Sequence, residues 1–462
     1  MTYHNAVKYI NSAPVQYVGE TSPDRIRTLC AYLGNPQNNM KYIRLAGSSG
    51  KTVCAVMLSE ILTKSGCKVG TLTMPAKTEP RDNIKVCGVC PDMPQTVELV
   101  KRVSSAVAKM KADIECRRVF AEKSEAPEEV GTEKENTAVT IPGKLLNGEI
   151  PCEPTVSELL LAVALLHFSD SGCRICIIES EHTPGDPSMF LPPPFAAVIC
   201  GTIPNSDKDE ILRIKSYIRR GIREIVSAPQ NREAYKIISD ACAAVNCRLS
   251  VPARSALGIK SMTLKGSEFT YKGRDYTVNL CGKFQVTNAT TVIETVGMLN
   301  RMKFGISYED EAAGIAAVRL KSKFEVLSVM PVIIADSTHN AEAVHTVCGS
   351  MNDFRNITGT DIKLCLPPDI RLIDEYVKTL EKLGYNILSV YVVSQDALLR
   401  ITAEELSEKY AGIEAESFSS VKIAAKSVVG ALKSDEILLI SGTSGFTDKM
   451  RFEVLRFMED RM

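Results

Sequence analysis

The sequence lacks an excess of charge of either sign, and it lacks any long apolar run. Its 462 residues contain 55 Lys and Arg against 55 Asp and Glu, so the formal net charge is zero. A balanced charge gives no sign of a nucleic-acid or anionic-membrane surface, although it leaves room for a local basic site. No apolar stretch approaches the roughly 20 residues that a membrane helix needs. The first residues, MTYHNAVKYI, also lack the apolar region of a signal peptide. We therefore predict a cytoplasmic protein with small-molecule partners and no nucleic-acid or membrane partner.

The chain also lacks the character of a disulfide-rich secreted domain, although it has 15 cysteines. Most of them lie inside apolar runs of a long chain, which predicts reduced, buried thiols. Two CxxC pairs, Cys87/Cys90 and Cys173/Cys176, raise a structural zinc site as an alternative. The second pair lies in CRICIIES, a predicted strand in which residues three apart face opposite sides. One remaining pair supplies too few zinc ligands.

What the chain does have is a small-residue turn between a predicted strand and a predicted helix, in IRLAGSSGKT at residues 43–52. Such a turn points backbone N–H groups at one anion, and the helix that follows adds the positive end of its dipole. Lys51 would then reach the β- and γ-phosphates, and the Thr52 hydroxyl would ligate Mg²⁺. The eight-residue consensus asks for glycine where this chain has Leu45. A strand-turn-helix corner with a surface lysine is therefore the alternative.

Length and pattern predict two α/β domains. A chain of 462 residues exceeds one typical core. Strand and helix patterns alternate from the phosphate turn onward and restart near residue 321, which predicts parallel sheets flanked by helices. We assign residues 1–320 to an ATP-binding domain and residues 321–462 to a smaller Rossmann-like domain. A helix is predicted from Gln95 to Ala112. Residues 113–153, rich in charge, Pro and Gly, are predicted to be a mobile insertion.

Three motifs far apart in the chain resemble those of one family. They are GSSGKT near residue 50, GKFQVTNA near residue 285 and IIADSTHNAEA near residue 336, and the lead-in from Pro23 fits as well. Together they resemble the Mur ligase superfamily, and within it the folylpolyglutamate synthase and dihydrofolate synthase branch. The resemblance implies an N-terminal P-loop ATPase domain joined to a C-terminal α/β domain. It also implies an ATP- and Mg²⁺-dependent ligase, often monomeric, that adds glutamate to a (tetrahydro)folate through an acyl phosphate.

The resemblance assigns roles by matching position. It places the nucleotide on Gly47, Ser48, Ser49, Gly50, Lys51, Thr52, Gln285, Asn288, Lys323, Asp336 and Asn340. It makes Lys51, Glu179 and His339 catalytic, and Thr52 and Glu179 metal ligands. For Glu179 the alternative is an exposed carboxylate at a strand end. For His339 the alternative is a helix-capping residue.

Departures from the family pattern keep other functions open. Residues at family positions have changed to Met74, Ala76, Pro204 to Ser206, Arg219, Phe284 and Lys323. Arg219 stands where many members carbamylate a lysine, and its guanidinium stays protonated. These changes fall mainly on the second metal and the substrate-carboxylate side, where His182 is a candidate replacement ligand. One alternative is a pseudoenzyme that binds a nucleotide or a folate-like ligand. Another is a Mur-type ligase for a different acid and amine, because Thr directly after Lys is closer to the cell-wall pattern.

Overall fold

The structure is a computed structural model. It describes residues 1–16, 22–47, 49–74, 79–123, 139–180, 186–192, 196–203, 208–338, 341–394 and 401–460. The chain forms two compact units, each made of two segments: Met1–Pro252 with Thr290–Gly314, and Ala253–Ala289 with Ile315–Met462. The division at residue 320 is a different one, made on sequence pattern, and it stays a proposal about domains.

The first unit is built on a seven-stranded sheet with the order β3-β2-β4-β1-β5-β6-β7. Every neighbouring pair is parallel except β2 with β3, as alternating strands and helices predict. The strands are β1 (Lys41–Ala46), β2 (Val69–Leu72), β3 (Ile84–Val86), β4 (Ile175–Glu179), β5 (Ala196–Ile199), β6 (Glu224–Ser227) and β7 (Arg248–Ser250). The phosphate turn follows β1, in the middle of this sheet.

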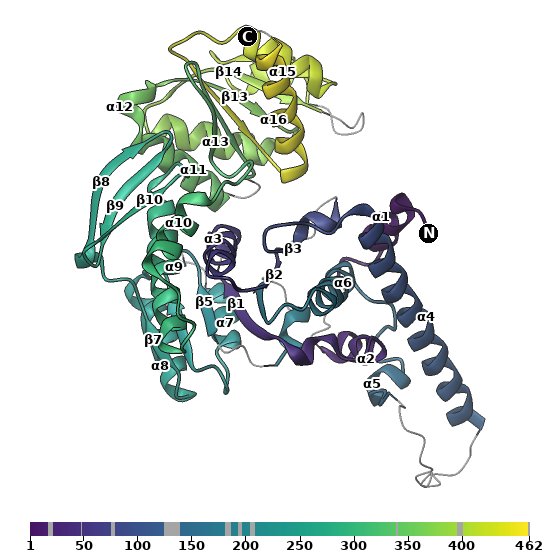
Figure 1. Cartoon of the computed structure of the whole chain (residues 1–462). Coiled ribbons are helices and arrows are strands. Elements are labelled where there is room, and N and C mark those ends of the chain that lie inside the picture. The colour runs from purple at the N-terminus through teal and green to yellow at the C-terminus, as the bar shows by residue number, and fades with distance from the viewer. Residues whose placement is uncertain are drawn as a thin grey trace. The chain divides into compact units, whose positions relative to one another are not determined.

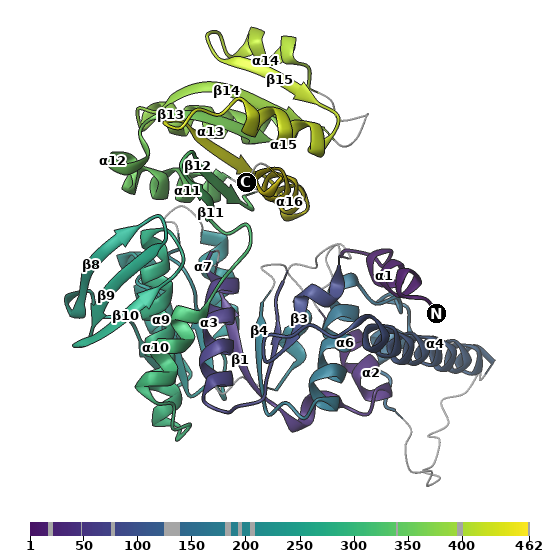
Figure 2. The same cartoon turned by 45° about the horizontal axis from the view of Figure 1, so that its top comes forward.

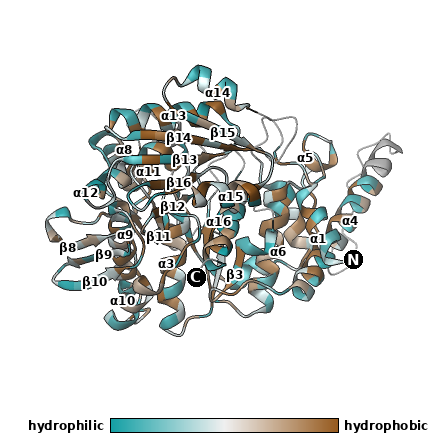
Figure 3. Cartoon of the chain, turned by 90° about the horizontal axis from the view of Figure 1, so that it is seen from above, coloured by the Kyte–Doolittle hydropathy of each residue, from teal (hydrophilic) through white to brown (hydrophobic). Residues whose placement is uncertain are grey.

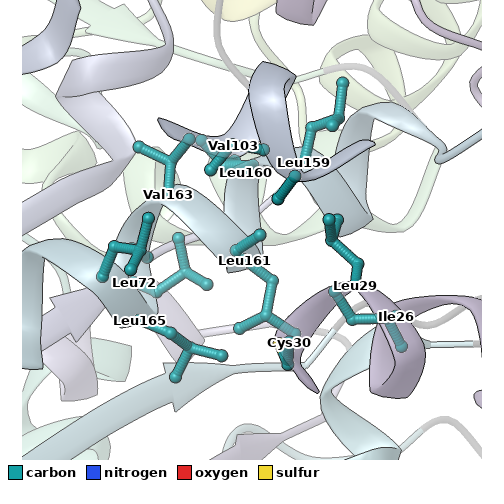
Figure 4. Packing of buried hydrophobic residues seen from close by; sticks show 14 of the residues in the cluster. Ile26, Leu29, Cys30, Leu72, Val103, Leu159, Leu160, Leu161, Val163 and Leu165 are labelled. Carbon is teal, nitrogen blue, oxygen red and sulfur yellow. The ribbon is translucent and has the colours of Figure 1, made fainter. Parts of the chain in front are cut away.

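Helices cover both faces of the sheet (Figures 1 and 2). The helices of this unit are α1 (Tyr3–Asn11), α2 (Asp24–Tyr32), α3 (Lys51–Lys64), α4 (Met93–Lys123), α5 (Gly143–Leu146), α6 (Val156–Asp170), α7 (Lys208–Tyr217) and α8 (Arg232–Ala244), with 3-10 turns η1 (Pro36–Asn39), η2 (Pro80–Asn83) and η3 (Pro187–Phe190). Helix α6 is apolar on nearly every side and is largely brown in Figure 3. An apolar helix of this kind has to be buried. Its leucines pack against α2, α4 and β2, as Figure 4 shows.

The segment predicted to be a mobile insertion, residues 113–153, differs from that prediction at both ends. Helix α4 continues past Ala112, and Ile114 on its buried face is 1% exposed. Apolar residues keep helical spacing through Met110 and Ile114, which explains why the helix does not stop. Residues 139–153 include α5 and buried apolar side chains that join the main core. The middle of the segment, residues 124–138, lies outside the described residues.

The second unit contains a three-stranded antiparallel sheet and a six-stranded sheet. The small sheet is β8 (Leu257–Thr263), β9 (Gly266–Tyr271) and β10 (Arg274–Val278), the predicted hairpins, and it follows the 3-10 turn η4 (Arg254–Ala256). The large sheet has the order β11-β12-β16-β13-β14-β15, with β11 antiparallel to β12 and the other pairs parallel. Its strands are β11 (Glu325–Val329), β12 (Val332–Asp336), β13 (Asp361–Leu366), β14 (Asn386–Val393), β15 (Glu414–Phe418) and β16 (Ile437–Ser441).

Two separate apolar clusters lie on the two faces of this large sheet. The helices of the region are α11 (Ala341–Asp353), α12 (Arg355–Thr358), α13 (Ile370–Lys382), α14 (Ala403–Lys409), α15 (Val421–Gly430) and α16 (Ser444–Glu459). Two further helices, α9 (Lys283–Arg301) and α10 (Tyr308–Ala317), each contribute residues to both units. The predicted class, a P-loop domain with a helix-flanked parallel sheet and a second α/β domain, is confirmed.

All 15 cysteines are free thiols, and most of them are buried. The prediction that most cysteines lie in the core is therefore confirmed. No helix among the described residues is long and apolar enough to cross a membrane.

Candidate functional site

The phosphate turn joins the end of β1 to the start of α3. Gly47 has a φ of 119° and Gly50, which caps α3, has a φ of 75°, both in the left-handed region that favours glycine. A turn of this kind at a helix N-terminus suits a phosphate group. The candidate residues Ser49 and Gly50 lie in the described turn, whereas Ser48 lies outside the described residues.

This turn packs directly on the segment that follows β5. A Cβ added at Gly47 would lie 2.0 Å from the carbonyl oxygen of Cys200, and one added at Gly201 would lie 2.3 Å from Ser49 Oγ. The backbone N–H of Cys200 donates to the carbonyl of Ala46 at 2.7 Å. The two segments therefore fit only because glycines stand where they meet.

Lys51, Thr52 and Glu179 come together at the carboxyl edge of the sheet. Lys51 Nζ donates to the carbonyl oxygen of Gly47 at 2.7 Å, so the ammonium group lies over the turn. Thr52 Oγ1 lies 3.0 Å from Glu179 Oε2 and 3.2 Å from Oε1. The contact arises because β1 and β4 are neighbours, with Leu45 opposite Glu179 in register. Glu179 is only 3% exposed, so the alternative of an exposed strand-end carboxylate is wrong.

The Thr52 and Glu179 oxygens fit the needs of Mg²⁺. This ion takes oxygen ligands, keeps several waters and is commonly held by one or two carboxylates together with substrate phosphates. The Thr52 hydroxyl and the Glu179 carboxylate lie 3.0 Å apart, next to a turn that suits a phosphate group, and so provide oxygen ligands of this kind. Within the described part of the chain, no group of three or more His, Cys, Asp or Glu side chains is placed to hold a metal. The zinc alternative therefore gains no support there.

Beneath the turn lie two buried thiols that the sequence prediction did not single out. Cys54 on α3 and Cys200 after β5 are both 0% exposed. Two causes raise the pKa of Cys200 well above its usual range: the larger is a hydrogen bond with the Cys54 thiol, and the second is burial. The Cys200 thiol is thus neutral and places no negative charge beneath the turn.

A buried polar cluster supports the segment after Glu179, and the sequence prediction missed it. Arg44 lies on β1 and is 2% exposed, and its guanidinium donates to the carbonyl of Ser188 at 2.6 Å. Burial lowers the pKa of Arg44 to about 10, and the nearby Asp186 carboxylate opposes this shift. Tyr217 donates its hydroxyl to Asp186 at 3.0 Å. The signal in the sequence was an arginine within an apolar strand, since a buried charge needs a partner.

Arg219 belongs to the same neighbourhood. Its guanidinium donates to the carbonyls of Met189 at 2.8 Å and Leu191 at 3.1 Å, which fixes η3. Burial lowers the pKa of Arg219, and Asp186 opposes the shift. Arg219, which stands where many family members carbamylate a lysine, therefore binds backbone carbonyls in this chain. Other positions named for their departure from the family pattern lie outside the described residues: Ala76, His182 and Pro204 to Ser206.

In the second unit, Asp336 organises the turn that precedes β11. Its Oδ2 accepts a hydrogen bond from the backbone N–H of Phe324 at 2.6 Å, and its other carboxylate oxygen accepts one from Thr338. Lys323 lies in this turn, between Ser322 and Phe324, and is half-buried. His339 and Asn340, which the sequence places next to Asp336, lie outside the described residues.

Gln285 and Asn288, the other candidate nucleotide residues of the second unit, are buried on α9. They are 0% and 4% exposed, and Asn288 Nδ2 donates to Gln285 Oε1 at 3.1 Å. Gln285 Nε2 is buried without a hydrogen-bond partner among the described residues. Phe284, which replaces a family histidine, packs edge-on against Phe324 at 6.3 Å between ring centroids. A phenyl ring cannot act as a ligand or a base.

Comparisons with known proteins agree with the resemblance seen in the motifs. No family model matches the chain. A protein of Haloferax volcanii, described as a probable bifunctional folylpolyglutamate synthase/dihydropteroate synthase, is 23% identical over 363 residues, which cover 77% of this chain and 39% of that protein. The chain thus spans about two fifths of that relative's length. The folylpolyglutamate synthase of Lacticaseibacillus casei is 22% identical over 366 residues, and 75% of each chain is covered.

Solved structures show the same fold. The folylpolyglutamate synthase of Thermotoga maritima superposes with a TM-score of 0.75 at 17% identity, over 98% of this chain and 96% of that one. A solved folylpolyglutamate synthase complex with AMPPCP and folate gives a TM-score of 0.70 at 18% identity, over 99% of this chain and all of that one. The predicted resemblance to the folylpolyglutamate synthase and dihydrofolate synthase branch is therefore confirmed.

Proposed function

We propose that the chain is an ATP-dependent carboxylate–amine ligase that adds glutamate to a (tetrahydro)folate. The observation that carries this proposal is the site at the end of β1 and β4, where Lys51 covers the phosphate turn and Thr52 meets a buried Glu179. The similarity to folylpolyglutamate synthases and the solved complex of one with an ATP analogue and folate favour this substrate pair.

The site residues have distinct roles in this reaction. The γ-phosphoryl group of ATP passes to the substrate carboxylate and gives an acyl phosphate; the amine of glutamate then attacks the acyl carbon, and phosphate leaves. Phosphoryl transfer depends mostly on positioning and charge neutralisation. Backbone N–H groups of the turn from Gly47 to Gly50 would hold the phosphates, and Lys51 would neutralise charge on the β- and γ-phosphates. Thr52 and Glu179 would hold Mg²⁺, which shields the phosphate charge.

The second unit supplies further candidates for this reaction. Asp336 lies at a strand end, and Lys323 lies in the turn bonded to it. The buried, unpaired Nε2 of Gln285 is a donor that a bound nucleotide could use. We retain Gln285, Asn288, Lys323, Asp336, His339 and Asn340 as nucleotide or catalytic residues of the proposal. We also infer a cytoplasmic monomer whose partners are small molecules.

The direct test is ATP turnover by the purified chain with a panel of folates and amino acids. We expect phosphate release that requires both a folate and glutamate, and a product whose mass has grown by one glutamyl unit per phosphate. Mass spectrometry and a phosphate assay measure the two quantities independently. Nucleotide binding with no product from any acceptor would contradict the ligase proposal.

A second candidate function is binding without catalysis. It is favoured by Arg219, whose guanidinium is committed to two backbone carbonyls, and by Met74, which replaces a hydroxyl residue of the family pattern. Product formed with another acid or amine would instead support the Mur-type alternative. The same panel of substrates separates these three outcomes.

Replacing Gly47 with alanine is expected to weaken ATP binding about tenfold or more. The new Cβ would lie 2.0 Å from the Cys200 carbonyl oxygen, and overpacking of this kind costs about 1–3 kcal/mol. Calorimetric titration with a non-hydrolysable ATP analogue measures the loss. Gly66→Ala is the matched control, because Gly66 also has a positive φ, of 79°, but no atom lies within 4 Å of the place that its new methyl group would take. Equal losses in both variants would show that backbone strain, and not the clash, is responsible.

A further inference from the structure

The end of helix α8 brings two cysteines together. The backbone N–H of Cys247 donates to the carbonyl of Cys242 at 2.9 Å. Between them, Asn246 has a φ of 57° and donates its backbone N–H to the carbonyl of Ala243 at 3.1 Å. These bonds define a Schellman motif, in which the outermost two side chains pack together. With standard bond lengths, the 2.9 Å bond also keeps the two cysteine Cα atoms within about 7 Å, the limit for a disulfide.

Helices α3 and α6 end with the same long backbone bond, but there a cysteine meets an apolar residue. Cys67 donates its backbone N–H to the Leu62 carbonyl at 2.9 Å, and Cys173 donates to the Phe168 carbonyl at 2.9 Å. An apolar contact is the usual one at this place. Burial raises the pKa of Cys173 to about 11. A cysteine packed in this way against a phenyl ring is therefore a weak acid.

The thiol partner on α8 changes the chemistry of Cys247. A hydrogen bond from Cys242 lowers the pKa of Cys247, although burial and the Glu224 carboxylate oppose this shift. The same hydrogen bond, together with burial, raises the pKa of Cys242, so the shared proton stays on Cys242. Cys247 is 8% exposed and Cys242 is 1% exposed. Because the thiolate is the nucleophilic form of cysteine, Cys247 is the sulfur that reacts first.

We propose that Cys247 and Cys242 form a redox modification site, at which hydrogen peroxide oxidises Cys247 and Cys242 then closes a disulfide across the end of α8. The site lies away from the phosphate turn. Cys247 directly precedes β7, at the amino edge of the parallel strands, whereas the turn follows β1 at the carboxyl edge of the same sheet. The proposal therefore does not depend on the proposed ligase activity.

The reaction has two steps. The Cys247 thiolate attacks one oxygen of the peroxide, an S–O bond forms, the O–O bond breaks, and the hydroxide that leaves takes up a proton to become water. The Cys242 sulfur then attacks the sulfenic acid on Cys247 and gives its proton to the leaving hydroxyl group. An S–S bond forms, the S–O bond breaks and a second water leaves. The two thiols lose two electrons, which reduce the peroxide.

The test is peroxide treatment of the full, reduced chain, followed by alkylation under denaturing conditions, trypsin digestion and mass spectrometry. Residues 237–248, IISDACAAVNCR, form one tryptic peptide that contains both cysteines and no other. We expect this peptide to escape alkylation and to be lighter by two hydrogen atoms than its reduced form. A reducing dithiol should restore both alkylation sites. A peptide that stays reduced, or that carries sulfinic or sulfonic acid in place of the disulfide, would overturn the proposal.

Two variants test the order of the steps. Cys242→Ser keeps a hydrogen-bond donor but cannot close a disulfide, so a sulfenic acid should accumulate on Cys247, where dimedone traps it. Cys247→Ser should leave Cys242 reduced and open to alkylation after denaturation. Dimedone on Cys242 in the second variant, or none on Cys247 in the first, would overturn the roles assigned to the two sulfurs.

The pair Cys54 and Cys200 is the matched control within the same chain. Its thiols are also joined by a hydrogen bond, but both residues are 0% exposed, and that bond and burial raise the pKa of Cys200. The pair on α8 should therefore oxidise at least about tenfold faster. Equal rates would show that proximity alone controls oxidation, and would overturn the role of Cys247 as the reactive thiolate.

Discussion

Replacing Lys51 with alanine is expected to lower kcat for ATP-dependent ligation by about 10²–10³-fold, the usual cost of losing one charge-stabilising group. Lys51 Nζ lies over the phosphate turn, 2.7 Å from the Gly47 carbonyl. Removing its ammonium group takes away the positive charge that would neutralise the β- and γ-phosphates. Phosphate release under saturating ATP measures the effect.

The matched control for this variant is Lys64→Ala, which removes an exposed lysine from the last turn of the same helix. It should leave kcat within about twofold of the wild-type value, because surface changes away from special features have small effects. Thermal unfolding of both variants shows whether either substitution disturbs the fold. Wild-type turnover by a folded Lys51→Ala chain would remove the phosphate turn from the proposed mechanism.

Features that depend on local backbone conformation could be predicted from the sequence. The phosphate turn was predictable because Gly47 and Gly50 both need positive φ, and a strand and a helix flank them within a few residues. Glu179 was predictable as a strand-end carboxylate, and its motif suggested its role. The α/β class followed from alternating patterns, and the solved structures of similar fold agree with it.

Features that depend on the order of strands could not be predicted in this way. Leu72 lies opposite Ile178 only because β2 and β4 are neighbours, although about 100 residues of sequence separate them. The cluster of Arg44, Asp186 and Tyr217 likewise joins three separate segments. An arginine inside an apolar strand indicated that some partner must exist, but the sequence could not say which one.

The largest expected effect on stability comes from Arg25→Met in helix α2. Arg25 Nε donates to Glu158 Oε2 at 2.7 Å, and the two side chains are only 4% and 5% exposed. The substitution leaves the Glu158 carboxylate buried without its cation, which typically costs about 3–5 kcal/mol. Hydrogen exchange at the amides of α6 measures the loss locally. A local measurement is needed because a chain of 462 residues with two units is not expected to unfold in a single two-state step.

The double variant Arg25→Met with Glu158→Leu separates the buried charge from packing. Removing both charges should recover most of the lost stability, because apolar replacement of a buried ion pair is often neutral. Recovery should stop about 1 kcal/mol short of the wild type. Glu158 also accepts a hydrogen bond from the backbone N–H of Thr155 at 2.8 Å and so completes the capping box of α6, which leucine cannot do. A double variant as unstable as Arg25→Met alone would show that the loss comes from packing around Arg25, and that the uncompensated carboxylate contributes little.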